Sequence, residues 1–309
     1  MPEEERPSEE TLHKLLQLTE EIENFQRIAL RLKPEPGEIP RLPGIDVFGI
    51  NIPLAGAIGG DHIIYIDFKH RYDLDARIEQ AQKKGLPQIA AKLEEMKQTA
   101  GVLLADVAGH QITDAVLAAM LHQSFLLGAL YELDIFGMIT TRLFENINNR
   151  FFRSSSVRKF VTMIYGEINV SGRFRFISAG HHPPLVFSNE FDHFVDIDPD
   201  LMISYPPIGT MPSKTDPDLS RRPSTLGYKD KYVVNEIKLM GPGDILVLYT
   251  DGLKEHEKDR ENYFPGRLEE KIRQFKKESV RLILEEISRD LREFGPPSDD
   301  ISCVLIKKS

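Results

Sequence analysis

Four aspartates lie in turn-forming segments at the ends of short apolar runs: Asp61, Asp106, Asp251 and Asp299. The neighbouring runs are rich in branched residues and flanked by turn residues, which predicts buried strands. Carboxylates that converge at strand ends repel one another unless divalent ions neutralise them. Oxygen ligands without a thiol cluster favour magnesium or manganese over zinc. The pattern therefore predicts a shared metal site.

A single Asp-Gly pair has a simpler interpretation. Asp251-Gly252 alone is more typical of a hairpin turn than of a ligand site. Four such segments in one chain, each with its own local pattern, favour the metal site.

The elements that must position these residues predict an α+β fold. The chain has 309 residues and 41% apolar content, enough for one large domain with an accessory segment. Strand-like runs surround two long helices instead of alternating regularly with helices, which predicts two packed antiparallel β-sheets, a β-sandwich, with helices outside. The expected helices are 113–131, 135–152 and 279–293, and the expected strands are 63–68, 101–105, 160–170, 173–178, 184–187, 232–239, 244–249 and 301–306. A loop at 192–230 includes a segment rich in Pro, Ser and Asp, 206–227, that is expected to move.

Residues 8–33 are predicted to form an amphipathic helix before the main domain. Ser8 can cap it, and Pro34 ends it. Alternating spacings of three and four make a heptad seam, which suits a parallel coiled-coil dimer; its members are Leu15, Leu18, Ile22, Phe25, Ala29 and Leu32. A wider apolar face that includes Leu12 and Leu16 fits packing on the chain's own domain equally well. We expect a dimerisation or regulatory segment at 1–39 and the main domain at 40–309.

The main domain contains a helical insertion at 73–98. Two charged amphipathic helices, broken at Gly85-Leu86-Pro87, stand between two strands that could pair through a short turn. The insertion fits a regulatory element or a solvated decoration without function.

Composition excludes several functional classes. The formal net charge is −9 without a basic stripe, so no nucleic-acid partner is expected. The single cysteine, Cys303, lies in a predicted strand and fits a reducing compartment. No apolar run is expected to cross a bilayer, because His122, Gln123 and Ser124 interrupt the longest one. The acidic start is unlike a signal peptide. We therefore expect a cytoplasmic protein without a membrane partner.

Five motifs, preceded by Leu42-Pro43-Gly44, resemble in this order the SpoIIE-type bacterial serine phosphatases, a branch of the metal-dependent protein phosphatase (PPM, protein phosphatase 2C-like) superfamily. The resemblance covers residues 40–308. The motifs are Gly59-Gly60-Asp61, Ala105-Asp106-Val107-Ala108-Gly109-His110, Ser178-Ala179-Gly180-His181-His182-Pro183-Pro184, Tyr249-Thr250-Asp251-Gly252 and Ser298-Asp299-Asp300-Ile301-Ser302.

The resemblance implies a β-sandwich flanked by helices on both faces and hydrolysis of phosphoserine or phosphothreonine on a protein. Two Mn²⁺ or Mg²⁺ ions at one end of the sandwich would activate the attacking water. Asp106 would bridge both ions, and Asp251 and Asp299 would complete one of them. The Val107 carbonyl would serve the other ion, and Asp61 would contribute its carboxylate, directly or through water.

Other motif residues are expected to support this site. His110 and His181 are candidates for structural support of the ligands, and His181-His182 is expected to fix a turn. Gly180, Gly209 and Gly252 are positions where the backbone geometry calls for glycine. The sequence departs from its relatives at Gln111, where they usually have glycine, and at the insertion 73–98, which marks a divergent subgroup.

The resemblance also implies partners. The expected substrate is a phosphorylated partner-switching regulator of the anti-sigma-factor antagonist type. Regulation would arrive through the helix at 8–33, by formation of a homodimer or by binding of an activator. Two other functions stay open: a non-catalytic scaffold, supported by Gln111, and a small-molecule phosphoesterase, favoured if the loop at 192–230 closes over the site.

Overall fold

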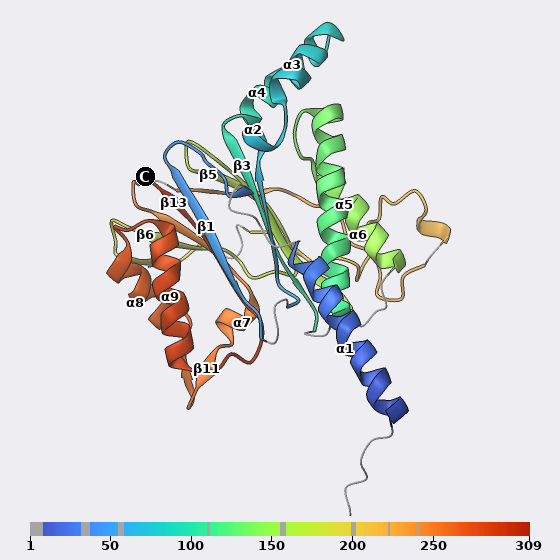
Figure 1. The fold of residues 1–309 in the computed structure, drawn as a ribbon. Helices are drawn as coiled ribbons and strands as arrows, with labels where there is room; N and C mark the ends of the chain where they lie inside the picture. The colour runs from blue at the N-terminus through green and yellow to red at the C-terminus, as the bar shows by residue number, and fades with distance from the viewer. Residues whose placement is uncertain are drawn as a thin grey trace, which may run out of the picture.

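Two β-sheets pack face to face, and helices cover the outer face of each (Figure 1). This computed structural model describes residues 9–31, 38–54, 59–109, 112–154, 159–198, 202–221, 223–239 and 241–309. Its helices are α1 (Glu9–Leu30), α2 (Phe68–Arg71), α3 (Leu74–Lys83), α4 (Pro87–Met96), α5 (Ile112–Phe136), α6 (Thr141–Ser154), η3 (Leu219–Arg221), α7 (Asp251–Lys254), α8 (Gly266–Phe275) and α9 (Val280–Phe294). Its strands are β1 (Ile45–Ile52), β2 (His62–Asp67), β3 (Thr99–Val107), β4 (Val161–Asn169), β5 (Arg173–Ala179), β6 (Leu185–Ser188), β7 (His193–Val195), β8 (Ser204–Tyr205), β9 (Asn235–Lys238), β10 (Ile245–Tyr249), β11 (Glu257–Lys258), β12 (Glu261–Asn262) and β13 (Ile301–Lys308).

The sheet order confirms the predicted β-sandwich. One sheet runs β1-β13-β10-β6-β7 and the other β2-β3-β4-β5-β8, with β9 also paired to β5. Among the strand pairs that the structure describes in these two sheets, the short pair of β5 and β8 is parallel and the others are antiparallel. Every expected strand is present with small shifts at its ends. Elements that were not predicted are β1, α8 and the short α2, η3, α7, β7, β8, β11 and β12.

Three apolar layers hold these elements together. One lies between the two sheets and includes Val102 and Val304. The second packs α8 and α9 on the β10–β13 sheet, with Ile287 as a member. The third packs α2 to α6 on the other sheet and is called here the α5 core; Phe125 lies within it. Because both faces of β3 and β13 are covered by these layers, the sequences of the two strands are nearly continuous apolar runs.

The insertion at 73–98 belongs to the α5 core. Strands β2 and β3 pair antiparallel with Asp67 opposite Ala100, so α2, α3 and α4 stand at the tip of this hairpin. Leu74, Ile78 and Leu93 are buried in the core. The apolar face of the insertion therefore extends the core, and its role, regulatory element or decoration without function, stays a prediction.

Helix α5 contradicts the expectation that no apolar run is long enough to cross a bilayer. Within the part of the chain that the structure describes, Asp114–Phe136 is long and apolar enough to cross a membrane, with mean hydropathy 1.4. The polar interruption at His122–Ser124 does not lower the average enough to prevent this. One side of the helix, including Leu121 and Phe125, is fully buried in the α5 core.

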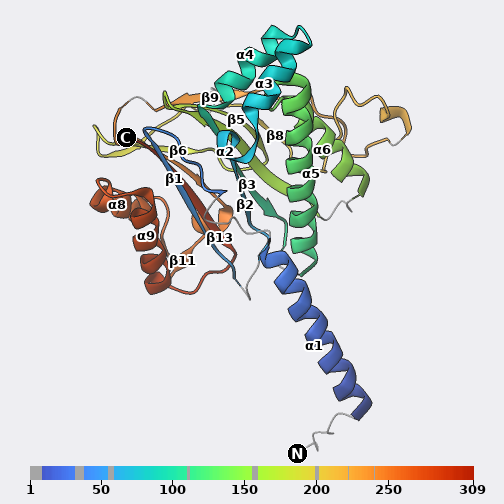
Figure 2. The ribbon, with the colours of Figure 1, turned by 45° about the horizontal axis from the view of Figure 1, so that its top comes forward.

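Helix α1 points away from the sandwich (Figure 2). Its apolar side chains are exposed: Leu15 by 52%, Leu18 by 55% and Ile22 by 40%. Ser8, Leu32 and Lys33 lie outside the described residues. At Leu15, Leu18 and Ile22 the chain's own domain therefore does not cover the seam, which contradicts, for this described part, the interpretation that the seam packs on that domain.

Candidate active site

The predicted metal-site aspartates meet at one end of the sandwich. Asp61 precedes β2, and Asp106 lies near the end of β3, which is the neighbour of β2 in one sheet. In the other sheet, Asp251 follows β10 and Asp299 precedes the neighbouring β13. Asp106 is electrostatically coupled to Asp61, Asp251 and Asp299, so the two sheets bring these carboxylates together.

The electrostatics of the cluster disfavour several bare negative charges. Burial, and then repulsion by Asp251 and Asp299, raises the pKa of the Asp106 carboxyl to about 7. Burial, and then the charge of Asp106, raises the pKa of Asp61 well above its usual range. Because desolvation and like charges both oppose ionisation, a bound cation would relieve this penalty.

Asp61 is fixed by hydrogen bonds from the opposite sheet. The Thr250 hydroxyl donates to its Oδ2 at 2.7 Å, and the Ser302 main-chain N–H donates to the Thr250 oxygen at 2.9 Å. The Asn51 amide donates to the Asp61 carbonyl at 3.0 Å. Asp61 itself is only 5% exposed. Its carboxylate is thus held from the sheet that contains β10 and β13.

Asp106 is oriented by a chain of two polar residues. Thr162 lies directly opposite Asp106 in the β3–β4 register and hydrogen-bonds to its side chain. The Thr162 oxygen lies 3.1 Å from His181 Nδ1. When the Asp106 carboxylate is ionised it only accepts, so Thr162 then donates to Asp106, and the Thr162 oxygen accepts from the His181 Nδ1–H. Burial lowers the pKa of His181 to about 3, so the ring is neutral.

Asp300 ties the surrounding loops to the end of β13. Its carboxylate accepts from the main-chain N–H groups of Leu54 and Gly60, each at 2.6 Å. A Cβ on Gly252 would lie 2.0 Å from the Asp300 carbonyl, so the turn after Asp251 needs glycine at this close approach. The adjacent acids Asp299 and Asp300 therefore differ in role, since Asp300 anchors the loop that leads to Asp61.

Two further contacts join α5 to the site. Lys159 forms an ion pair with Asp114 and donates to the Ala108 carbonyl at 3.3 Å, so the start of α5 is fixed beside the Asp106 loop. His62 Nε2 and His122 Nδ1 lie 2.8 Å apart, which connects the middle of α5 to the residue after Asp61. His110 and Gln111, for which the sequence made predictions, lie outside the described residues.

The donor set fits hard divalent cations. Its side-chain donors are the oxygens of several mutually repelling carboxyl groups. Mg²⁺ and Mn²⁺ prefer such oxygen ligands. A Cβ on Gly60 would lie 2.7 Å from the Val107 carbonyl, so glycine lets the Asp61 loop approach this potential oxygen donor. Among the described residues, no three acidic, histidine or cysteine side chains already form a ready ligand group.

Comparison with known protein families shows which family the chain belongs to. The family described as Stage II sporulation protein E (SpoIIE) matches residues 97–309. The chain belongs to the SpoIIE family. The match includes Asp106, Asp251 and Asp299, while Asp61 and helices α3 and α4 of this SpoIIE-family chain precede it.

Relatives of this SpoIIE-family chain agree with the assignment. The phosphoserine phosphatase RsbU of Bacillus subtilis (strain 168) is 23% identical over 161 residues, which are 52% of this chain and 40% of RsbU. The SiaA-PP2C domain of Pseudomonas aeruginosa superposes with a TM-score of 0.64 at 13% identity, covering 96% of this chain and 99% of that domain. The RsbU and RsbW domains of Rv1364c from Mycobacterium tuberculosis give a TM-score of 0.61 at 19% identity, covering 89% of this chain and 64% of that one. These structures confirm the PP2C-like fold.

The supporting residues of the SpoIIE-family site were only partly predicted. Gly180 and Gly209 have positive φ angles of 66° and 86°, as expected for glycine positions. His181 was predicted as structural support, but its partner Thr162 was not, because the contact depends on the register of β4. Thr250 lies in a recognised motif, although its hydrogen bond to Asp61 has no sequence signal.

Proposed function

We propose that this protein is a metal-dependent protein serine/threonine phosphatase that hydrolyses phosphoserine or phosphothreonine with a water activated by two Mn²⁺ or Mg²⁺ ions. The observation that carries the proposal is the cluster of carboxylates around Asp106 in a chain that belongs to the SpoIIE family. Phosphate-monoester hydrolysis is extremely slow in water, so the site must neutralise a dianionic ester and provide a strong nucleophile.

The residues have separate roles in this proposal. Asp61, Asp106, Asp251, Asp299 and the Val107 carbonyl would hold the ions. Bound ions supply charge neutralisation and lower the pKa of water.

The protein supplies the preorganisation of these donors. Thr250 fixes the Asp61 carboxylate, and Thr162 orients that of Asp106. Asp300 holds the backbone of the Asp61 loop at Gly60. Donors fixed before the substrate arrives need little reorganisation during the reaction.

The proposed substrate is a phosphorylated partner-switching regulator of the anti-sigma-factor antagonist type. Support comes from the similarity to RsbU, of which the matched part of this chain spans less than half the length. A cytoplasmic location fits this substrate and the buried, unpaired thiol of Cys303.

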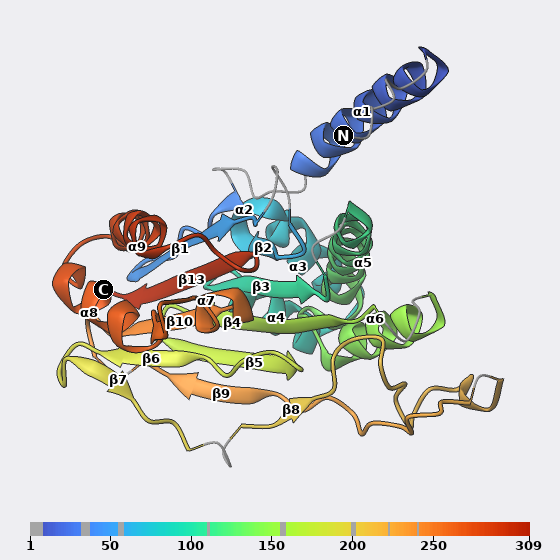
Figure 3. The same cartoon turned by 90° about the horizontal axis from the view of Figure 1, so that it is seen from below.

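Neither alternative gains support from the described residues. The scaffold hypothesis rests on Gln111, which lies outside them. The small-molecule hypothesis needs the loop at 192–230 to close over the site, but much of its second half packs along α6 (Figure 3). The phosphatase is therefore the function proposed.

Metal removal tests the proposal directly. With Mn²⁺, the protein is expected to hydrolyse p-nitrophenyl phosphate and a phosphoserine peptide, and EDTA should abolish both activities until Mn²⁺ is restored. Calorimetry should detect Mn²⁺ binding at the same concentrations. Activity that persists in EDTA would contradict the two-metal mechanism, whereas neither turnover nor Mn²⁺ binding would support the scaffold.

Regulation is proposed to act through residues 1–39. Because the described leucine and isoleucine side chains of α1 are exposed, deletion of 1–33 is expected to convert a homodimer to a monomer while changing the melting temperature of the domain by no more than about 2 °C. Light scattering and thermal melting measure the two effects. A deletion that leaves the mass per particle, the activity and the response to candidate activators unchanged would refute the regulatory role.

A further inference from the structure

A cavity of about 210 Å³ lies where the connection between α5 and α6 meets β4 and β5. Its lining includes Tyr165 and Glu167 of β4 and Arg175 of β5. Thr162, the partner of Asp106, lies earlier on β4 and projects from the opposite face of the sheet. The five residues from Thr162 to Glu167 span about 17 Å of strand. The cavity is therefore separate from the candidate active site.

The inner wall of the cavity is apolar and belongs to the α5 core. Ile139, Phe144 and Ile177 line it, and each is at most 6% exposed. Because an apolar cavity of about 150 Å³ can hold benzene, a cavity of this size accommodates about eight non-hydrogen atoms. The cavity thus suits a small molecule better than a nucleotide or a peptide.

Two opposite charges stand side by side on the polar wall. Glu167 and Arg175 are direct partners in the β4–β5 register, so they project from the same face of the sheet, and both line the cavity. The charge of Arg175 acts on Glu167 and Glu236. Within the described part of the chain its guanidinium forms no direct ion pair with either carboxylate, and Glu236 pairs with Arg173 at 2.6 Å. Glu167 accepts one hydrogen bond, from the Tyr165 hydroxyl at 2.9 Å. Both charges can therefore contact a ligand in the cavity.

The polar wall is complementary to a ligand that carries both charges. Burial raises the pKa of the Glu167 carboxyl to about 7, although Tyr165 and Arg175 act in the other direction. A ligand ammonium beside this carboxyl would offset the cost of burying its charge. Arg175 can hold a carboxylate through two parallel hydrogen bonds. Thr141 also lines the cavity and begins α6, so the positive end of that helix adds to the attraction for a carboxylate.

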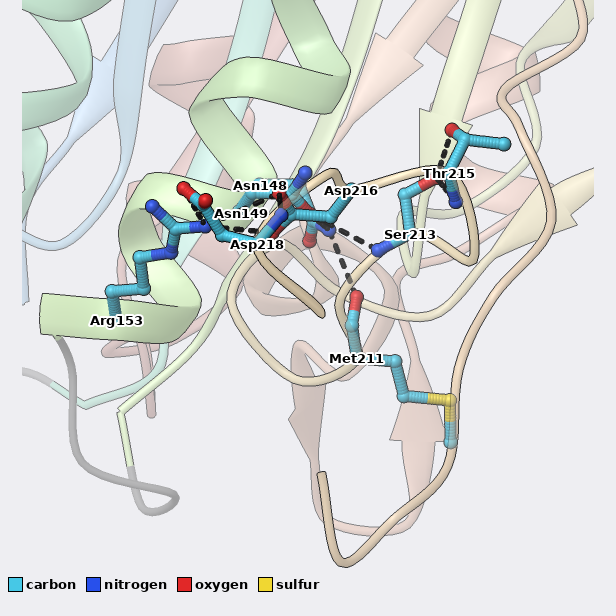
Figure 4. A network of polar contacts seen from close by, with 8 residues as sticks. All are labelled: Asn148, Asn149, Arg153, Met211, Ser213, Thr215, Asp216 and Asp218. Carbon is cyan, nitrogen blue, oxygen red and sulfur yellow. Dashed lines mark hydrogen bonds and ion pairs between the residues drawn. The ribbon is translucent and has the colours of Figure 1, made fainter. Parts of the chain in front are cut away.

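Helix α6, which forms one side of the cavity, is fastened to the loop after β8, contrary to the expectation that 206–227 moves. The fully buried Asn148 accepts from the Gly209 N–H at 3.0 Å and donates to the Met211 carbonyl at 2.8 Å. The asparagine that follows it in α6 accepts from the Ser213 N–H at 3.0 Å (Figure 4). These contacts fix α6, and a preorganised wall reduces the entropy cost of binding.

The end of the loop is fastened beside the rim of the cavity. Glu145 of α6 accepts from the Tyr232 N–H at 2.7 Å and pairs with the almost completely buried Lys229 at 2.9 Å. Val234 follows shortly after Tyr232, is 37% exposed and lines the cavity. The rim is therefore positioned by the same helix that forms the wall.

We propose that this cavity binds a free apolar α-amino acid of the size of valine or leucine. The ammonium group of the ligand contacts Glu167, its carboxylate contacts Arg175, and its side chain packs on the apolar wall. Because a single carbon atom joins the two charged groups of an α-amino acid, both can reach protein side chains that stand next to each other. The inference goes beyond the proposed phosphatase function and does not depend on it.

Calorimetric titration of the full chain without Mn²⁺ tests the proposal with ligands that differ by one group. L-Valine or L-leucine is expected to bind. L-Leucinamide lacks the carboxylate and N-acetyl-L-leucine lacks the ammonium group, so each should bind at least about tenfold more weakly than L-leucine. L-Aspartate should not bind, because its side-chain carboxylate would lie against the apolar wall.

Variants of the polar wall place the binding in this cavity. Glu167→Gln keeps an acceptor for Tyr165 but removes the charge, and it should weaken binding at least about tenfold. Arg175→Gln should do the same. The matched control Glu285→Gln, on the exposed side of α9, should bind like the parent. Thermal melting checks that each variant is folded, and the added amino acid should raise the melting temperature of the parent and the control.

Three results would overturn the proposal: no binding of either apolar amino acid by the folded parent, equal binding of L-leucine and L-leucinamide, or unchanged affinity in Glu167→Gln. None of these measurements needs a metal ion or turnover. Binding with the expected pattern therefore supports the amino-acid site even if no phosphoester is hydrolysed, and its absence leaves the proposed phosphatase standing.

Discussion

Asp106→Asn is expected to abolish Mn²⁺-dependent hydrolysis while making the metal-free protein more stable at pH 8. The loss of activity should be about 10³-fold or more, because the variant removes the carboxylate at the centre of the proposed metal site. Asp251→Asn should also lose activity. Hydrolysis of p-nitrophenyl phosphate and of a phosphoserine peptide measures both variants.

The gain in stability follows from the pKa of Asp106. The carboxyl loses its proton near pH 4 in the unfolded chain but only near pH 7 in the folded protein. Protonation therefore favours the folded state; this contribution is fully present below about pH 4 and is lost as the pH rises through about 7. At pH 8 the buried charge destabilises the metal-free fold, and asparagine removes that cost, on the order of 2–4 kcal/mol.

Urea unfolding in EDTA at pH 5 and pH 8 checks the sign, and Asp75→Asn on the exposed side of α3 is the matched control. The difference in the free energy of unfolding between Asp106→Asn and the parent should be larger at pH 8 than at pH 5. A variant that loses activity and stability together would mean that Asp106 is a structural residue, which would contradict the arrangement described above.

Thr162→Val is expected to weaken Mn²⁺ binding by about 10- to 100-fold, the usual cost of losing a residue that orients a metal ligand. Valine keeps the shape of threonine but removes the hydroxyl that joins Asp106 to His181. Calorimetry measures the affinity. Because the ligand itself stays, activity should recover substantially at saturating Mn²⁺.

Two variants make this second prediction specific. Thr162→Ser keeps the hydroxyl and should restore most of the Mn²⁺ affinity. Thr99→Val makes the same substitution at a buried position of β3, where the hydroxyl bonds only to the Glu95 carbonyl, and should bind Mn²⁺ like the parent. Unchanged affinity in Thr162→Val would show that the hydroxyl does not position Asp106.

The β-sandwich, and the strand ends at which the candidate site lies, could be predicted from the sequence. Apolar runs such as Ile245–Tyr249 are clear strand predictions because all of their residues are buried, so that the run is short and continuously apolar. Strand β1 was missed because it lies at a sheet edge with mostly half-buried residues. Helix α8 was missed because only Leu268 and Ile272 of its residues are buried, which leaves a weak helical period.

Finer assignments depend on side-chain direction and register. Asp299 and Asp300 are chemically equivalent in sequence, and only the turn before β13 turns Asp300 toward the N–H groups of Leu54 and Gly60. The loop after β8 has the composition of a mobile segment, but Asn148, buried on a helix 61 to 63 residues earlier in the chain, supplies its missing backbone partners. Local sequence propensity does not indicate such contacts between residues that are distant in the sequence.

The hairpin of β2 and β3 also has a practical consequence. The carboxylates lie at one end of this hairpin, and the turn between α3 and α4 lies beyond the other. At that turn, Gly85 has a φ of +69° and open space where a side chain would be. Exposed turns with small residues are where added chain is best accepted. The α3–α4 turn is therefore a suitable place to attach a fluorescent reporter, since the full length of two paired strands would separate it from the chemistry.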